Sequence, residues 1–285
     1  MLGAVVGTLG AWFIYALIGV FGRRYPASEI AWLVGPLGGD TIGDRPYEET
    51  ARAEGLTLVR DASEGGLIPE FDVLASEAFD PQRVHPKIRD FYQNTSAYRL
   101  DTWASTYFPA NVALWLLVMT ISRRVQQLNF PLDGLDTAHG MTSEIILLRE
   151  PDGKIRYTGW FRKLARKAQV IYTGFYMTTR VPHAPGACVK VVFPMPNGNA
   201  TVILRPENDD DSGLRLVSAG RRFGDAGFYR VQRSGDSLRV WRIGSLHEIF
   251  ALYVEADGTL RCEHAIRFLG FRVLTLHYRI AAASG

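Results

Sequence analysis

Residues 188–218 read CVKVVFPMPNGNATVILRPENDDDSGLRLVS, and this stretch carries the pattern that decides the fold. Three short runs rich in valine, isoleucine and leucine are separated by Asn-Gly-Asn at 197–199 and Asp-Ser-Gly at 211–213. Such runs are typical of β-strands, and Gly and Asn accept the positive φ angles that tight turns require. The stretch therefore predicts three consecutive antiparallel strands.

The same pattern continues in both directions, from Met141 to the end of the chain. Further turn residues occur at 151–153, 234–236 and 256–258. The predicted strands are Ser143–Leu148, Ile155–Phe161, Val170–Thr178, Cys188–Phe193, Ala200–Arg205, Leu214–Ser218, Phe228–Arg233, Ser237–Ile243, Thr259–Phe268 and Arg272–Ile280. Because no helix-length crossover separates most of them, we expect an antiparallel β-meander of about ten strands. A sheet of that length must curl or close to protect its edges, which favours a barrel-like, half-barrel or sandwich arrangement.

Helices are expected mainly before this β-rich part. A short helix is predicted over Tyr47–Glu54, because proline precedes it and Gly55 ends it. A second helix opens at Pro86 within HPKIRDFYQNTSAYRL, and the apolar run Ala110–Ile121 is expected to form a third, in the core or at a membrane interface. Within the β-rich part, one short helix is expected from Ser245 to Leu252.

The amino terminus resembles a membrane anchor. Residues 2–22 (LGAVVGTLGAWFIYALIGVFG) contain no charged side chain and are followed by Arg23 and Arg24. As a helix they would be roughly 31 Å long, enough to cross a hydrocarbon core of about 30 Å. Because the arginines follow the span, we expect a single-pass protein with most of the chain in the cytoplasm. Gly3 and Gly7 would allow two such helices to form a homodimer.

Two alternatives to the anchor remain open. A cleaved signal peptide would carry basic residues before its apolar run, whereas none precede this one. A helix that is apolar on all sides could also be buried in a large soluble core. With the anchor, the chain divides into a transmembrane segment (1–24), a helical and loop-rich cap region (25–140) and an antiparallel β-rich domain (141–285), which is an α+β fold.

The composition excludes several classes of protein. The chain has 285 residues, 47% of them hydrophobic, and a formal net charge of +3. Its two cysteines are too few for a disulfide-rich scaffold, an all-cysteine zinc site or an iron–sulfur cluster. Residues 1–140 carry 11 basic and 16 acidic side chains, and the remainder carries 21 and 13, which indicates two parts with different surroundings. Neither half has the concentrated basic footprint or the module of a nucleic-acid-binding protein.

Strong catalytic motifs are absent from the sequence. There is no P-loop, no His-Glu-x-x-His, no Gly-x-Ser-x-Gly elbow and no Cys-x-x-Cys pair. We therefore expect no cofactor and no metal site.

His264 is the first candidate for chemistry. Strand alternation places His264 on the same face as Cys262 and Ile266, so a polar side chain lies on an apolar face. Its near-neutral pKa in solution suits ligand contact or proton transfer inside a cavity. The alternative is a core histidine whose ring is hydrogen-bonded to a neighbouring hydroxyl or carbonyl group.

A second group of candidate catalytic residues lies where the helical part gives way to strands. Asp136 could orient His139 as an acid–base pair, with Glu144 nearby in sequence. The alternative is a turn rich in capping residues.

Basic side chains suggest two further roles. Arg205 and Arg221, with Tyr229, are candidate ligand-binding residues, because arginine binds carboxylates and phosphates; an ion pair with Asp225 is the simpler account of this loop. Segment 154–167 (KIRYTGWFRKLARK) has six basic residues and no acid, which is typical of contact with anionic headgroups or, alternatively, of a solvated strand edge. The candidate membrane-surface residues are Arg23, Arg24, Arg162, Lys163, Arg166 and Lys167.

Three function hypotheses follow. The first is a membrane-anchored domain that binds a lipid or another apolar small molecule in a β-rich cavity. The second is an enzyme without a nucleotide cofactor, a hydrolase, isomerase or cyclase, that uses His264 or His139 in that cavity. The third is a structural or assembly partner without a cavity.

Overall fold

A single antiparallel sheet forms most of the protein. The computed structural model describes residues 18–39, 42–62, 64–107, 141–164 and 170–283. The strands of its sheet are β1 (Arg23–Pro26), β2 (Thr57–Val59), β3 (Tyr98–Thr106), β4 (Met141–Arg149), β5 (Ile155–Leu164), β6 (Val170–Arg180), β7 (Ala187–Met195), β8 (Gly198–Asn208), β9 (Leu214–Val217), β10 (Phe228–Ser234), β11 (Ser237–Arg242), β12 (Leu246–Val254), β13 (Leu260–Phe268) and β14 (Phe271–Ala282). The strand content and the turn positions predicted from the sequence are thus confirmed in outline.

The strands follow one another in a meander that branches once. The order is β2-β4-β5-β6-β7-β8-β9-β12-β13-β14-β3, and all pairings between strands are antiparallel. At β8 the sheet divides, because residues 205–208 pair with β9 whereas residues 198–202 pair with β10, which continues to β11 and β1. Among the described residues the path ends at β2 and at β3, so the sheet that they form is open rather than a closed barrel.

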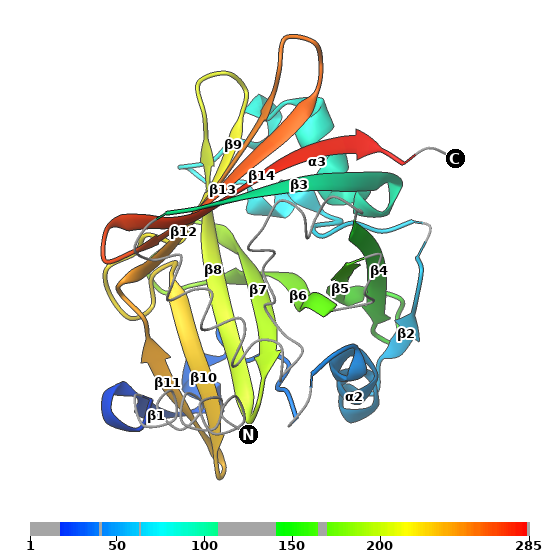
Figure 1. The fold of residues 1–285 in the computed structure, drawn as a ribbon. Coiled ribbons are helices and arrows are strands. Elements are labelled where there is room, and N and C mark those ends of the chain that lie inside the picture. The colour runs from blue at the N-terminus through cyan, green and yellow to red at the C-terminus, as the bar shows by residue number, and fades with distance from the viewer. Residues whose placement is uncertain (1–17, 40–41, 63, 108–140, 165–169, 284–285) are drawn as a thin grey trace, which may run out of the picture.

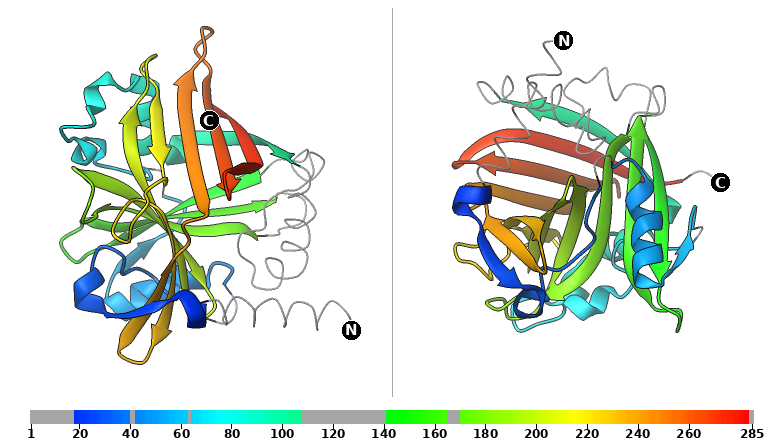
Figure 2. Two further views of the ribbon diagram at one scale, coloured as in Figure 1. Left: turned by 90° about the vertical axis from the view of Figure 1, so that its left-hand side faces the viewer. Right: turned by 90° about the horizontal axis from the view of Figure 1, so that it is seen from below.

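The sheet curves strongly, so that strands far apart in its order face each other (Figures 1 and 2). A helix and three short turns fill one end of the concave face: α3 (Pro86–Gln93) and the 3₁₀ turns η2 (Phe71–Leu74), η3 (Pro81–Arg83) and η4 (Thr95–Ala97). Buried side chains of this segment pack with inward-facing residues of β4, β7, β8, β12, β13 and β14 in one apolar cluster. This packing leaves the other end of the concave face to the candidate site described below.

The outer face of the sheet is covered by α2 (Arg45–Glu54), beside β4 in Figure 1. Tyr47 is fully buried there against Phe161 and Phe175. Gly159 makes this possible, since a Cβ atom at that position would lie 2.4 Å from the Tyr47 ring. The predicted helix is confirmed, with Gly55 in the left-handed conformation at its C-cap. A separate apolar cluster lies under the 3₁₀ turn η1 (Ala27–Ile30) and includes Tyr229.

One predicted helix is a strand instead, and the end of the stretch given for another is part of a strand. Residues 245–252, expected to be a short helix, contribute to β12, which pairs with both β9 and β13. The helix that opens at Pro86 is confirmed, but it ends at Gln93 and residues 98–106 form β3 beside β14. In both cases pairing with a neighbouring strand satisfies the backbone, which outweighs a weak local helical pattern. The region predicted to be a helical cap, residues 25–140, therefore contributes β2, β3 and the end of β1 to the sheet.

The structure describes only the last residues of the predicted membrane anchor. Residues 1–17 lie outside the described part, and with them Gly3 and Gly7; residues 18–21 are helical and lead directly into β1. None of the helices in the described ranges has the length and apolar character needed to cross a bilayer. The apolar run Ala110–Ile121 also lies outside the described residues.

Candidate functional site

His264 forms a buried pair with Glu248. Its Nε2 atom lies 3.3 Å from Glu248 Oε2, and the two side chains are only 8% and 12% exposed. The Phe250 ring stacks on the imidazole with centroids 3.8 Å apart. The predicted alternation in β13 is therefore confirmed, and the partner of His264 is a carboxylate rather than a hydroxyl or a backbone carbonyl.

Strand register explains how the pair forms. Phe250 is directly opposite His264, and Glu248 is opposite Ile266, so Glu248 is the diagonal neighbour of His264 on the same face of the sheet. The Ser218 side chain accepts a hydrogen bond from the backbone N–H of Glu248 at 2.7 Å, which fixes β12 against the end of β9. The pair is thus held by the backbone of three strands.

Arg162 lies on the same concave side but comes from β5. It is 2% exposed, and its Nη2 atom donates to Thr102 Oγ1 in β3 at 3.4 Å. Its guanidinium carbon lies 5.1 Å from the Trp160 ring centroid and 5.7 Å from that of Tyr278 in β14. Because β5 is separated from β3 and β14 by most of the sheet, only the curvature of the sheet brings these side chains together.

We call Thr102, Arg162, Glu248, His264 and Tyr278 the inner polar cluster. Burial raises the pKa of the Tyr278 hydroxyl, and the negative charge of Glu248 acts in the same direction, whereas Arg162 lowers it. Tyr278 is opposite Cys262, whose thiol pKa is also raised by burial. The cluster thus combines a cation, a neutral hydroxyl donor and a carboxylate–imidazole pair in a desolvated setting, which suits binding of an acidic group or proton transfer.

The polar cluster is bordered by apolar side chains on the same strands. Ile266, Leu274 and Leu276 are buried in a small cluster, against which Ala104 and Tyr278 pack. An acidic group bound by Arg162 would therefore have apolar side chains next to it.

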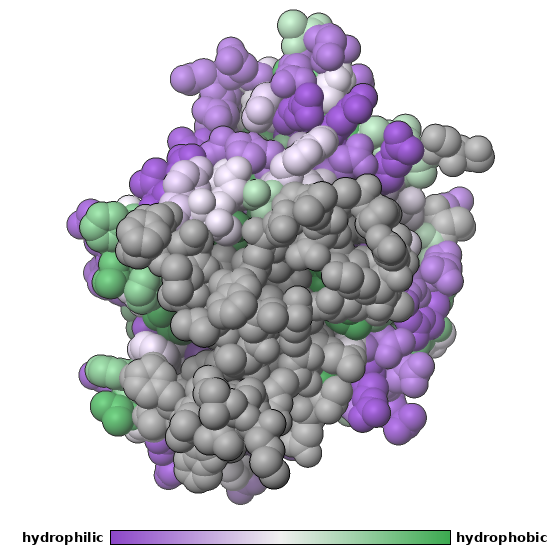
Figure 3. Space-filling model, viewed as in Figure 1, coloured by the Kyte–Doolittle hydropathy of each residue, from purple (hydrophilic) through white to green (hydrophobic). Residues whose placement is uncertain are grey.

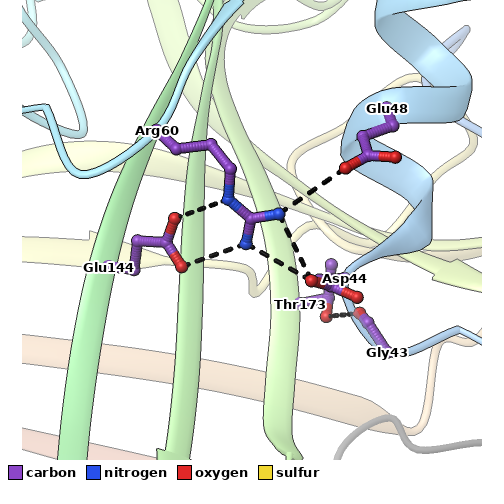
Figure 4. A network of polar contacts seen from close by, with 6 residues as sticks. All are labelled: Gly43, Asp44, Glu48, Arg60, Glu144 and Thr173. Atoms are coloured by element: carbon purple, nitrogen blue, oxygen red, sulfur yellow. Dashed lines mark hydrogen bonds and ion pairs between the residues drawn. The ribbon is translucent and has the colours of Figure 1, made fainter.

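Glu144 is not part of this cluster. It points to the other face of β4, where its Oε1 and Oε2 atoms accept hydrogen bonds from Arg60 at 2.8 and 3.1 Å (Figure 4). Arg60 also contacts Asp44 at 3.3 Å and Glu48 at 3.8 Å, next to the short contact between Thr173 and Gly43. The network joins the beginning of α2 to β4. Asp136 and His139 lie outside the described residues.

The Arg60 network provides a stability prediction. We expect Glu144→Gln to lower the free energy of unfolding by about 1–2 kcal/mol, because a charged acceptor of a two-bond contact is lost in a side chain that is only 15% exposed. Glu48→Gln is the matched control and should change it by less than about 0.5 kcal/mol, since that side chain is 60% exposed. Urea denaturation measures both. Equal effects would contradict a special contribution of Glu144.

The predicted ligand-binding residues do not join the inner polar cluster. Arg205 pairs with Glu207 at 2.5 Å, and Tyr229 lies in the apolar cluster on the opposite face of the sheet, where its hydroxyl donates to the Asp225 carbonyl at 2.7 Å. The Asp225 carboxylate accepts from the backbone N–H groups of Arg221 and Arg222. Burial alone would raise the pKa of Asp225, but these bonds and His183 lower it. Asp225 therefore organises its own loop.

The predicted membrane-surface residues are distributed over different environments. Arg23 and Arg24 are exposed on the edge strand β1, and Lys163 lies partly buried over the Phe161 ring. Arg166 and Lys167 are outside the described residues. Arg162, by contrast, is buried in the inner polar cluster, because alternation turns it to the concave face of β5.

A surface groove near η1 is a second place to consider. It has a volume of about 920 Å³ and is lined by Ala27, Ala31, Val34, Glu54, Leu56, Glu150, Pro151, Asp152, Arg156 and Tyr157. Arg156 is paired with Glu54 at 3.1 Å and with Glu150 at 3.0 Å. The arginine at this groove is thus already paired with two of the acids that line it, so it is not prepared to bind an anionic ligand. The described residues also contain no group of three or more His, Cys, Asp or Glu side chains placed to hold a metal ion.

Three members of the inner polar cluster were not predicted. Glu248 was missed because residues 245–252 were expected to be helical; read as a strand, Leu246, Glu248, Phe250 and Leu252 alternate on one face and leave an acid on an apolar side. Thr102 lies just after the stretch expected to hold the Pro86 helix, where no strand was predicted. Tyr278 had no local feature that could have identified it.

A comparison with curated proteins finds a membrane protein of similar sequence. No family model matches the chain, and no solved structure matches it. The chain is 27% identical over 284 residues to a curated relative, the uncharacterized membrane protein YndJ of Bacillus subtilis (strain 168). The match covers 94% of this chain and 49% of the relative, so the chain spans about half the length of that protein.

Proposed function

We propose that this chain is a membrane-anchored domain that binds an anionic amphiphile on the concave face of its curved sheet. Such a ligand has an acidic head and an apolar body, as fatty acids and acidic lipids do. The observation that carries the proposal is the Arg162 guanidinium, which is 2% exposed on a face otherwise lined largely by apolar side chains. Membrane location is supported by the apolar segment 2–22 and by the name of the Bacillus relative.

The surroundings of Arg162 support an acidic head group. A planar guanidinium binds carboxylate or phosphate oxygens through two parallel hydrogen bonds, and such bonds are strong in a desolvated setting. Tyr278 and Thr102 contribute hydroxyl groups at the same place. Burial raises the pKa of Tyr278, so its hydroxyl stays protonated and able to donate at neutral pH.

The proposal is tested on the full chain, purified in detergent from the membranes of the expressing cells. Mass spectrometry of an organic extract should find an acidic amphiphile, and the purified protein should bind a fluorescent long-chain fatty acid. Arg162→Met is expected to weaken that binding about 10- to 100-fold, since a bond to a charged group contributes about 1.5–3 kcal/mol. Arg162→Lys should retain part of the affinity because it keeps the charge.

Arg205→Met is the matched control for this experiment. Arg205 is also an arginine of the sheet, but its side chain is 46% exposed and is paired with Glu207, so its replacement should leave fatty-acid affinity unchanged. If Arg162→Met binds as tightly as the wild type, Arg162 is not the head-group site. If no acidic amphiphile is extracted and none binds, the proposal fails, and a structural or assembly role becomes the better explanation.

The pair of His264 and Glu248 favours a second candidate function. A carboxylate that contacts an imidazole at 3.3 Å could orient it as a general acid or base, so the same face could hold a hydrolase, isomerase or cyclase that acts on an apolar substrate. Hydrolysis of a long-chain p-nitrophenyl ester by the full chain tests the hydrolase case. His264→Gln should then reduce turnover by about 10²- to 10⁴-fold while fatty-acid binding persists. Absence of turnover by the wild type would exclude this activity.

A further inference from the structure

The turn between β13 and β14 exposes an apolar tip. Phe268, Leu269 and Phe271 are 45%, 67% and 76% exposed, and Arg267 and Arg272 flank them. Because Phe268 is opposite Phe271, Leu269 and Gly270 are the two residues of a tight hairpin turn. Apolar side chains at the tip of a hairpin gain nothing from the fold, since they pack against no core there.

The backbone at Leu269 makes this tip more unusual. Its φ angle is +51°, in the left-handed region that a bulky leucine adopts only at a cost of roughly 1 kcal/mol, and Asn or Gly would occupy it with less strain. The protein thus keeps an exposed leucine where both stability and solubility favour a polar residue. Residues of this kind are typical of interaction surfaces.

A second exposed apolar group lies on the same side of the molecule. Val20 and Phe21 are 75% and 58% exposed, and Phe21 stacks on Trp241 with ring centroids 5.6 Å apart. A short stretch of chain connects the two groups: Ser245 comes four residues after Trp241, and its carbonyl accepts a hydrogen bond from the Leu269 N–H at 2.8 Å. We call Val20, Phe21, Trp241, Phe268, Leu269 and Phe271 the aromatic face.

The figures agree with this arrangement. Figure 3 shows hydrophobic atoms at two heights on the left edge, where Figure 1 places the red β13–β14 turn and, below it, the region of β1. The left panel of Figure 2 looks onto this side, and both the turn and the dark-blue beginning of the described chain are in view.

The charges around the aromatic face are mainly positive. Arg23 and Arg24 follow Phe21, Arg239 donates to the Gly19 carbonyl at 3.0 Å, and Arg267 and Arg272 flank the tip. Glu263 is the acid in contact with them, paired with Arg272 at 3.3 Å. Exposed aromatic and aliphatic side chains can contact the acyl chains of a bilayer, and the arginines among them can bind the phosphates of anionic headgroups. The composition of this surface therefore matches an anionic membrane interface.

We infer that the aromatic face lies on an anionic lipid bilayer, with the β13–β14 tip entering the headgroup region. The continuity of the chain supports this occupant, because Phe21, the last apolar side chain before Gly22 ends the segment 2–22, lies on this same face. The inference rests on the membrane association in the proposed function and adds which side of the domain touches the bilayer. It does not depend on the ligand site at Arg162.

An environment-sensitive fluorophore on a single introduced cysteine tests the inference in the full chain. Both native thiols are buried, and burial raises the pKa of Cys188 to about 11 and that of Cys262 as well, so they react slowly. A label at Leu269→Cys should shift to shorter wavelength in vesicles of phosphatidylcholine with phosphatidylglycerol, and lipids carrying bromine on their chains should quench it. Ala256→Cys, in the turn beyond the other end of β13, a strand about 30 Å long, should respond to neither.

Leu269→Asn separates membrane contact from folding. Asparagine suits the positive φ angle, so we expect a melting temperature equal to or higher than that of the wild type. Hydrogen exchange of residues 266–273 in anionic vesicles should nevertheless be faster in this variant, because the tip no longer enters the lipid. Unchanged exchange would contradict the inference.

The remaining outcomes also decide the question. If the protein floats with the vesicles but the 269 label remains as exposed as the 256 label, the inference fails and membrane association stands. If the protein does not float with the vesicles, both the inference and the proposed membrane association fail. A shift at 269 that grows with protein concentration in detergent alone would make the face a self-association surface and would overturn the bilayer as its occupant.

Discussion

Lys190→Met is expected to raise the free energy of unfolding by about 2–3 kcal/mol at pH 7. Lys190 is 2% exposed on β7, and its Nζ atom donates to the Val34 carbonyl at 2.5 Å. Burial, and to a smaller extent the charge of Arg156, lowers the pKa of its ammonium group to about 7. The desolvation of this ammonium group therefore destabilises the fold by more than its single described hydrogen bond stabilises it. Methionine fills a similar volume and needs no such desolvation.

The Lys190 ammonium group should also make the free energy of unfolding depend on pH. Its pKa in the fold, about 7, is below the ordinary value of 10.5, so between these values the unfolded chain binds more protons than the folded one. Stability should therefore rise as pH increases from about 7 to about 10.5, by up to about 4 kcal/mol from this residue alone. Below pH 7 both states hold the proton, and the penalty stays constant.

The measurement is a series of urea denaturation curves for the wild type and Lys190→Met across this pH range. The advantage of the variant should be largest near pH 7 and should shrink as pH rises. Lys87→Met is the matched control, because Lys87 also donates to a backbone carbonyl, that of Gly258 at 2.8 Å, but is exposed. It should change stability by less than about 0.5 kcal/mol. Parallel pH profiles for wild type and Lys190→Met would refute the burial argument.

His264→Leu is expected to lower the free energy of unfolding by about 3 kcal/mol. The substitution keeps an apolar contact with Phe250 but removes the imidazole from Glu248, whose side chain is 12% exposed. A buried carboxylate that loses its partner bears the full penalty of desolvation. Thermal and urea denaturation both measure the loss.

A double replacement distinguishes this explanation from a simple packing defect. His264→Leu combined with Glu248→Leu removes both polar groups, so stability should return to within about 1 kcal/mol of the wild type. His277→Leu is the control, since His277 lies exposed on the outer face of β14 and should change stability by less than about 0.5 kcal/mol. If the double variant is less stable than His264→Leu alone, the pair is not coupled in this way.

The strands were predictable because their information is local. Alternation and turn residues such as Asn197-Gly198 and Asp257-Gly258 occur within a few positions of each other, and each hairpin uses them directly. The same local reading was wrong at residues 245–252, where the stretch fits a short helix as well as a strand. Pairing with β9 and β13 decided in favour of the strand.

The candidate site was predictable only in part. His264 could be found because a polar residue on an apolar strand face is visible in the sequence. Glu248 depended on the correct assignment of β12, and Arg162 was assigned to a membrane surface because its segment is basic as a whole. Its burial follows from which face of β5 turns inward, and that depends on what the sheet encloses.

By itself, the sequence determined an antiparallel meander, the helix before Gly55, a histidine on an apolar face and an apolar terminal segment. Each of these follows from residues that are neighbours in the chain. Only the tertiary structure decided that β5 faces β3 and β14, that Arg162 meets Tyr278, and that Phe21 and Leu269 lie on one side of the molecule. The physical reason is that sheet curvature adds small twists over many strands, so it brings together residues that no local pattern connects.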